Sequence, residues 1–140
     1  IKFVNTKIDA VVGQLSTNDA RFGYEIGEMS QSFNLESFDT ETTLGAIEYI
    51  IKYVQTKWCC PVIFYTCIRE NDVTYKQLVN HLYRLKTKWD IHIIDVYNND
   101  ELNKLAKSDK EMMADDSHPT KKGYRYLYTP ILVKQLDEIL

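Results

Sequence analysis

The sequence lacks the features that mark several large protein classes. Its three cysteines, Cys59, Cys60 and Cys67, are odd in number and irregularly spaced, which argues against a disulfide framework. A zinc site would need a second cluster of ligands, and the sequence has no such cluster of cysteines. We expect them to be small buried side chains around a strand, in a reducing compartment such as the cytoplasm, although an export signal ahead of residue 1 stays open. No apolar run approaches the roughly 18 residues of a membrane-spanning helix.

The sequence also lacks an excess of basic residues. It has 17 Lys+Arg against 20 Asp+Glu, a net charge of −3, so nucleic acid is not an expected partner. No glycine-rich strand-to-helix loop is found, which argues against a dinucleotide or nucleotide-phosphate site. What remains is an ordinary composition, with 44% hydrophobic and 26% charged residues over 140 positions. Such a chain suits one globular domain, and its first residue is Ile1 rather than Met.

Three apolar segments are typical of buried parallel strands, because they do not alternate strictly between apolar and polar residues. They span residues 8–15, 61–67 and 91–97. The second begins at Pro61, and a proline is tolerated at the first position of a strand. We therefore predict three strands.

Helix-like sequence follows each predicted strand. Over residues 43–58 and 73–89, apolar residues recur at spacings of three and four, which aligns them on one face of a helix. Asp39 or Thr40 is the expected N-cap of the first. A shorter helix is expected over 100–107, and a last one over about 121–140 that Pro130 kinks or divides.

Strands that alternate with helices favour an α/β fold with a parallel sheet, because crossover connections are right-handed. In such sheets the ligand site lies beyond the carboxyl ends of the strands. The polar residues that follow the strands are therefore the candidates for function.

The first candidate cluster is Ser16-Thr17-Asn18-Asp19, directly after the first predicted strand. Asn18 can direct its side-chain NH₂ across the top of the sheet, where it would stabilise a developing oxyanion. Asp19 would cap the following segment or hold the loop. The same four residue types also form ordinary turns after strands, so this cluster alone leaves both interpretations open.

The second candidate cluster is Asp115-Asp116-Ser117-His118-Pro119, ahead of the last predicted helix. His118 can act as a general base, and Asp115, three residues earlier, can fix its tautomer and orientation. Thr120 is placed to cap the helix that follows. Two alternatives stay open: ordinary capping by Asp-Asp-Ser, or a divalent metal held by the two aspartates and the histidine, although no further ligand cluster is evident.

Together the two clusters resemble the SGNH (GDSL-type) hydrolase family of esterases and lipases. The Gly-x-Asn-Asp motif of that family stands here as residues 16–19, with serine in place of glycine. Its late Asp-x-x-His-Pro motif matches residues 115–119, and residues 120–124 (TKKGY) resemble its entry into the last helix. The resemblance covers essentially the whole chain and implies a three-layer α/β/α fold with a flavodoxin-like parallel sheet.

The resemblance implies a serine hydrolase of small-molecule carboxylic esters, such as lipids or acylated sugars, that needs no metal or organic cofactor. His118 would be the general base, Asp115 would orient it, and Asn18 would donate to the oxyanion. The family's Gly-Asp-Ser nucleophile motif and its later glycine donor are absent from residues 1–140. We therefore expect the nucleophilic serine and the first two strands to precede Ile1, with residues 1–140 as the C-terminal part of a single domain.

The long polar loop over residues 23–38 and the residue before it carry aromatic side chains, among them Phe22, Tyr24 and Phe33. These side chains either line a substrate pocket or anchor the loop. A rival to the esterase is a non-catalytic, flavodoxin-like α/β domain that binds a ligand or a protein. The substituted glycine and the absent nucleophile favour the rival, whereas the intact Asp-x-x-His-Pro motif favours the enzyme.

Overall fold

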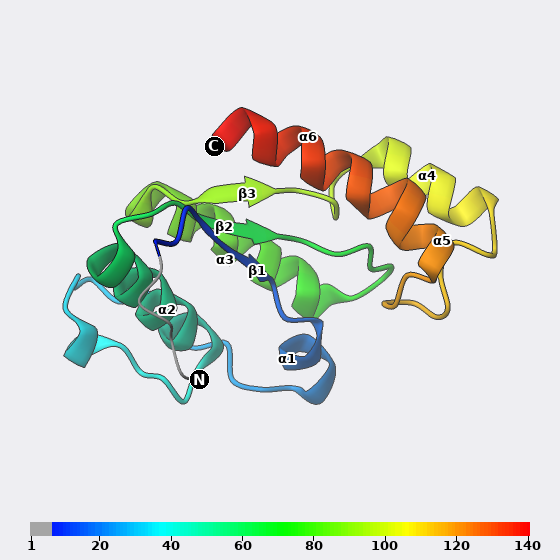
Figure 1. Ribbon diagram of the computed structural model, residues 1–140. Coiled ribbons are helices and arrows are strands. Elements are labelled where there is room, and N and C mark those ends of the chain that lie inside the picture. Colours follow the sequence, from blue (N-terminus) through cyan, green and yellow to red (C-terminus); the bar gives the residue numbers. More distant parts are fainter. Residues whose placement is uncertain (1–6) are drawn as a thin grey trace.

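A computed structural model describes residues 7–140 and contains a parallel sheet of three strands (Figure 1). The strands β1 (Val11–Gln14), β2 (Val62–Tyr65) and β3 (His92–Ile94) lie in that order. The three predicted strands are confirmed, but each is shorter than its apolar run. At the end of β2 the N–H groups of Cys67 and Ile68 donate to the hydroxyls of Tyr75 and Tyr128 rather than to a neighbouring strand.

Two long helices have the predicted bounds, namely α2 (Thr43–Trp58) and α3 (Val73–Trp89), and α4 (Asp100–Ser108) ends one residue later than predicted. The expected N-cap of α2 was wrong. Thr42 caps this helix, with its hydroxyl accepting from the N–H of Gly45 at 3.3 Å. The backbone of Asp39 instead packs on Gly45, where a Cβ atom would lie 2.0 Å from the Asp39 carbonyl oxygen. The chain therefore enters α2 through a turn that needs glycine at position 45.

Two short elements were not predicted. The helix α1 (Thr17–Phe22) follows β1, and the 3₁₀ turn η1 (Leu35–Ser37) interrupts the long loop. Ser16 caps α1, since its hydroxyl accepts from the N–H of Asp19 at 3.2 Å and donates to the Asp19 carboxylate at 2.8 Å. The polar cluster of residues 16–19 therefore forms the N-cap and first turn of α1.

The last predicted helix is divided, as Pro130 suggested. It consists of α5 (Lys121–Gly123), the π-helical turn η2 (Tyr124–Tyr128) and α6 (Thr129–Ile139). The N–H of Thr129 donates to the carbonyl of Tyr124, five residues earlier. Pro130 has no N–H and cannot donate to the preceding turn, which leaves room for this wider turn.

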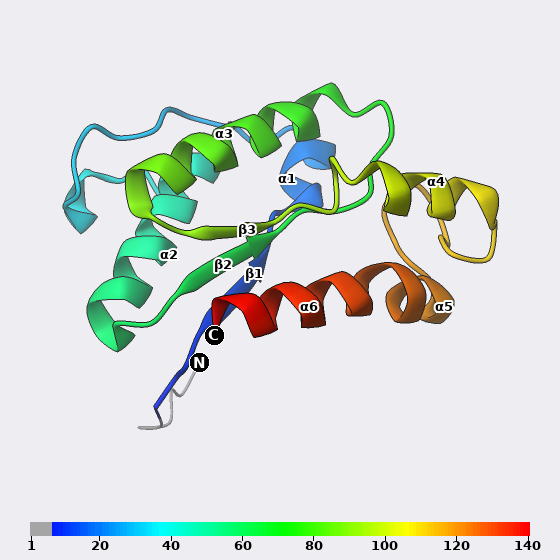
Figure 2. The same cartoon turned by 90° about the horizontal axis from the view of Figure 1, so that it is seen from above.

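Figure 2 shows α2 and α3 on one side of the sheet and α6 on the other. Leu44, Ile51, Leu78 and Leu82 pack with the sheet in the core on the α2 and α3 side. A second core lies under α4 and η2 and is built from Ile68, Val96, Ala106, Met112, Leu127 and Tyr128. The architecture is therefore mixed α/β and compatible with three layers. Over residues 7–140, no helix combines the length and the apolar character that crossing a membrane requires.

A buried ion pair ties the long loop to both helices on one side of the sheet. Glu48 on α2 has no exposed surface, and its Oε1 accepts from Lys88 Nζ at 2.6 Å and from Trp89 Nε1 at 2.9 Å. Its Oε2 accepts from the N–H of Ser30 at 2.8 Å. Lys88 Nζ also donates to the carbonyls of Ser30 and Ser32. Every polar atom of the carboxylate is therefore paired within the protein.

Replacing Glu48 by alanine is expected to lower the free energy of unfolding by about 3–5 kcal/mol, because it leaves the ammonium group of Lys88 buried without its anion. Urea denaturation followed by circular dichroism measures the change. Glu70→Ala is the matched control, since it breaks an exposed ion pair with Lys107 and is expected to cost less than about 1 kcal/mol. Equal effects of the two variants would contradict the role of Glu48.

Candidate functional site

The carboxyl ends of β1 and β2 border a hollow of about 240 Å³. Both sequence clusters contribute to it: Asn18 comes from α1, and His118 comes from the loop before α5. The lining consists of Gln14, Thr17, Asn18, Tyr65, Cys67, Ser117, His118, Pro119, Tyr124 and Tyr128. The fold therefore brings together two motifs that are far apart in the sequence.

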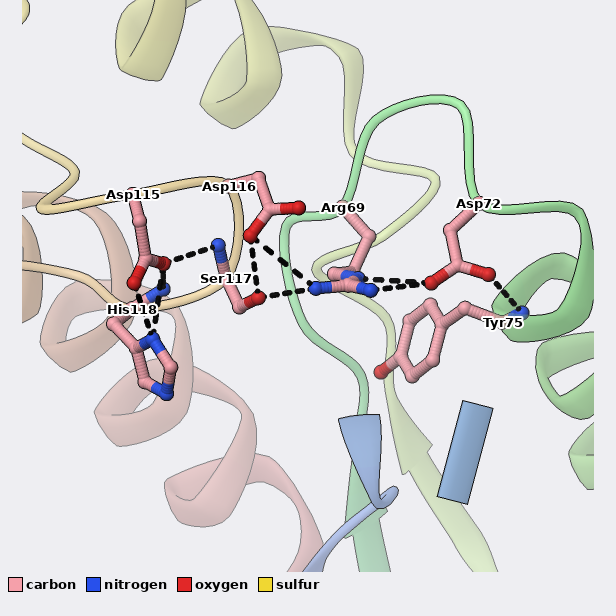
Figure 3. Close-up of polar contacts among 7 residues, drawn as sticks. All are labelled: Arg69, Asp72, Tyr75, Asp115, Asp116, Ser117 and His118. Atoms are coloured by element: carbon pink, nitrogen blue, oxygen red, sulfur yellow. Dashed lines mark hydrogen bonds and ion pairs between the residues drawn. The ribbon is translucent and has the colours of Figure 1, made fainter. Parts of the chain in front are cut away.

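Asp115 and His118 form a close pair (Figure 3), and His118 lines the hollow. Nδ1 of His118 lies 2.7 Å from Oδ2 of Asp115 and 2.9 Å from Oδ1. Because an ionised carboxylate only accepts hydrogen bonds, this contact selects the tautomer of the neutral imidazole with its proton on Nδ1 and Nε2 as the acceptor. The side chain of Asp115 is 50% exposed and that of His118 is 61% exposed, so the imidazole is open to solvent.

Three hydrogen bonds hold the carboxylate of Asp115. In addition to the imidazole, it accepts from the N–H groups of Ser117 and His118, both at 2.8 Å. The imidazole and these two N–H groups lower the pKa of Asp115 from 3.8 to about 2. A lowered pKa means that the contact is present above pH 3.8 and is lost only as the pH falls through about 2. Asp115 therefore stays ionised at neutral pH.

The loop that carries the pair is shaped by backbone bonds and one glycine. Met113 and Pro119 form an antiparallel bridge, and the N–H of Ala114 donates to the carbonyl of His118 at 2.7 Å. Thr120 caps α5, as predicted, by accepting from the N–H of Gly123 at 3.1 Å. A Cβ atom at Gly123 would lie 2.0 Å from the carbonyl oxygen of Met112. Gly123 of the TKKGY segment therefore allows α5 to pack closely against the loop that carries Asp115 and His118.

Asn18 lies in the first turn of α1 and is exposed. Over residues 7–140 its side-chain amide has no hydrogen-bond partner, so it is available to a ligand. Ser16, which stands where the motif of the family that the sequence resembles has glycine, has φ −62° and ψ 122°. Any residue adopts these angles, so this backbone does not require glycine. The substitution instead supplies the hydroxyl that caps α1.

Several lining residues were not predicted as site residues from the sequence. The hydroxyl of Tyr65 donates to the Gln14 side chain at 2.9 Å, and Tyr124 and Tyr128 come from the π-helical turn. Their positions at strand ends and after the histidine motif were the signals available in the sequence. Cys67 is also in the lining, and burial raises the pKa of its thiol, which therefore stays protonated near neutral pH.

The other two cysteines differ from each other. Cys60 is buried, as expected, whereas Cys59 is exposed; it caps the C-terminal end of α2 in a left-handed conformation with φ 52°. The expectation of three buried cysteines was therefore wrong for Cys59.

The aromatic side chains proposed for a substrate loop lie outside the hollow. Phe22 and Tyr24 are 65% and 61% exposed and pack edge to face with each other. Phe33 lies against Trp89, with a ring-centroid distance of 5.1 Å, next to the ion pair of Glu48. In this arrangement Phe33 anchors the loop.

Among the described residues, no hydroxyl or thiol is hydrogen-bonded to the imidazole of His118. The hydroxyl of Ser117 is engaged, since it accepts from Arg69 and donates to Asp116 at 2.9 Å. Residues 7–140 contain no group of three or more His, Cys, Asp or Glu side chains placed to hold a metal ion.

Comparisons with known proteins support the fold. No protein-family model matches the sequence, and no curated protein matches it. A crystal structure of a Lactobacillus plantarum protein, solved by the Northeast Structural Genomics consortium, is similar to this chain with a TM-score of 0.69 and 14% sequence identity. The similarity covers 94% of this chain and 68% of that one, and no activity is named for that protein. Similarity at this level of identity supports the fold alone.

Proposed function

We propose that this protein is a serine hydrolase of carboxylic esters with the flavodoxin-like sheet of the SGNH type. The observation that carries the proposal is the hollow at the ends of β1 and β2. There Asn18 and His118 line the same hollow, and Asp115 binds Nδ1 of the imidazole. This is the arrangement that acyl transfer needs from a base, its orienting acid and an oxyanion donor.

The proposed reaction is acyl transfer through a serine ester. The serine oxygen attacks the carbonyl carbon of the substrate while Nε2 of His118 removes its proton. The ionised Asp115 stabilises the resulting imidazolium, and the Asn18 side-chain NH₂ donates to the tetrahedral oxyanion. His118 then protonates the leaving alcohol, and water hydrolyses the acyl-enzyme by the same steps with water as the nucleophile.

In the proposal the serine belongs to a polypeptide segment upstream of residue 1. Among the described residues β1 pairs only with β2, so its other edge has free backbone N–H and C=O groups. Val12 on this strand is 44% exposed. A parallel strand added at this edge would end beside the hollow, and a serine after its last residue would face His118.

The lining of the hollow favours a small acyl group on a polar alcohol, such as an acetylated sugar, over a long lipid chain. Its side chains carry hydroxyl and amide groups at Gln14, Thr17, Asn18 and Tyr65, and it contains no leucine, isoleucine or valine. A volume of about 240 Å³ suits an acetyl group with part of the alcohol.

Labelling of the full-length protein with a fluorophosphonate tests the proposal. We expect a single adduct on a serine upstream of residue 1, located by mass spectrometry of the peptides. The heat-unfolded protein is the control and should remain unlabelled, because its serine no longer lies beside His118. A folded protein without any adduct would favour the non-catalytic binding domain.

A further inference from the structure

Arg69 is a buried cation beside the candidate site. It lies in the loop between β2 and α3, and its side chain is only 7% exposed. The residues before it are fixed, because the N–H groups of Cys67 and Ile68 donate to the hydroxyls of Tyr75 and Tyr128 at 2.8 and 2.9 Å. A buried charge must have partners within the protein, and those of Arg69 lie on two different segments.

On one side Arg69 binds the start of α3. Its Nε and Nη2 donate to Oδ2 of Asp72 at 3.1 and 2.5 Å, while Oδ1 of Asp72 caps the helix by accepting from the N–H of Tyr75 at 2.8 Å. Burial disfavours the charge of Asp72, but these hydrogen bonds outweigh it and lower its pKa. The guanidinium is therefore anchored to a long helix of the core.

On the other side Arg69 binds the histidine loop. Its Nη1 donates to the hydroxyl of Ser117 and lies 3.5 Å from Oδ1 of Asp116 (Figure 3). The hydroxyl of Ser117 donates in turn to Asp116 at 2.9 Å. Ser117 is 7% exposed, in contrast to the half-exposed pair of Asp115 and His118.

Ser117 connects this contact to the candidate catalytic pair. Its N–H donates to Oδ1 of Asp115, and Asp115 holds Nδ1 of His118. A continuous series of hydrogen bonds thus runs from the first turn of α3 through Arg69 and Ser117 to the imidazole (Figure 3). Within the loop itself, the N–H of Ala114 donates to the carbonyl of His118 and closes residues 114–118 into a turn.

We propose that Arg69 is a positioning residue, which holds Ser117 and through it keeps the Asp115–His118 pair over the hollow. The consequence for catalysis rests on the proposed ester hydrolase activity. Arginine suits the role because its planar fork reaches Asp72 with one edge and Ser117 with another, whereas a lysine ammonium is a single point charge. Displacement of a catalytic group by about 1 Å can cost about a hundredfold in rate.

Two variants of the full-length protein test this role. Arg69→Lys keeps a cation for Asp72 but cannot span both partners. Ser117→Ala removes the hydroxyl that accepts from Nη1 of Arg69, while the Arg69–Asp72 pair and the 3.5 Å contact with Asp116 remain. Each is expected to lower kcat for an aryl acetate by about 10- to 100-fold, with KM within about twofold. Because both substitutions break the same contact, kcat of the double variant should lie within about twofold of kcat of the slower single variant. Arg84→Lys, on α3 and next to His81, is the control and should leave kcat unchanged.

Amide hydrogen exchange, measured by NMR, reads the position of the loop without any catalysis. Exchange at Ser117 and His118 should become at least about tenfold faster in both variants, while the amides of Ile63 and Phe64 in β2 keep their rates. Unchanged exchange at residues 117 and 118 would overturn the positioning role, as would faster exchange with an unchanged kcat. The positioning role would also be overturned if the fold-loss of kcat in the double variant equalled the product of the two single-variant losses. If the unmodified protein hydrolyses no ester, the proposed function fails, and the exchange rates still decide whether Arg69 holds the loop.

Discussion

Replacing His118 by alanine in the full-length protein is expected to lower kcat for a short-chain aryl ester by about a hundred- to ten-thousandfold. Without the imidazole, no group at the hollow removes the proton of the attacking serine. The fold should persist, because the His118 side chain is 61% exposed and its loop is held by backbone bonds. Initial rates at saturating ester, with circular dichroism as a check on the fold, measure the effect.

His81→Ala is the matched control for this variant. His81 lies on α3, where its Nδ1 contacts Arg84 rather than the hollow. We expect this variant to keep the full rate. If His118→Ala retained most of the activity while remaining folded, the assignment of the general base would be wrong.

Replacing Asn18 by alanine is expected to lower kcat by about a hundred- to a thousandfold, with little change in KM. The amide of Asn18 has no partner among residues 7–140, so its donor is free for the oxyanion that forms in the transition state. An interaction made only in the transition state affects kcat rather than substrate affinity. Michaelis–Menten kinetics with the same aryl ester separate the two constants.

Asn80→Ala serves as the control, because Asn80 is an exposed residue of α3 that does not line the hollow. It should behave like the unmodified protein. A variant of Asn18 with a raised KM and an unchanged kcat would assign this side chain to substrate binding and would contradict the oxyanion role.

Most of the secondary structure could be predicted because it depends on local patterns. The spacing of Leu44, Ile51, Leu78 and Leu82 gave the bounds of α2 and α3, since each helix buries one face against the sheet. The strands were predicted too long, because their ends are decided by partners on other elements. The N–H of Cys67, for instance, donates to the hydroxyl of Tyr75 on α3 rather than to a neighbouring strand.

The candidate site was predictable only in part. Asp115 and His118 are three residues apart, so their contact follows from a local turn. The location of Asn18 at the same hollow follows from the parallel order of the strands. The role of Arg69 could not be foreseen, because it depends on Ser117, which is 48 residues away in the sequence. A sequence pattern within a short window carries no information about a partner so far away in the chain.

The π-helical turn over Tyr124–Tyr128 has a consequence for how this region can vary. One extra residue in a turn rotates everything after it by about 100° relative to an uninterrupted α-helix. That rotation decides which side of α6 meets the sheet, and Ile131 and Leu132 now pack on the second core. The same turn sets Tyr124 and Tyr128 at the hollow. A single-residue deletion within this turn would therefore both turn α6 away from the sheet and rotate Tyr128 away from the hollow, so the length of this segment is under a double constraint.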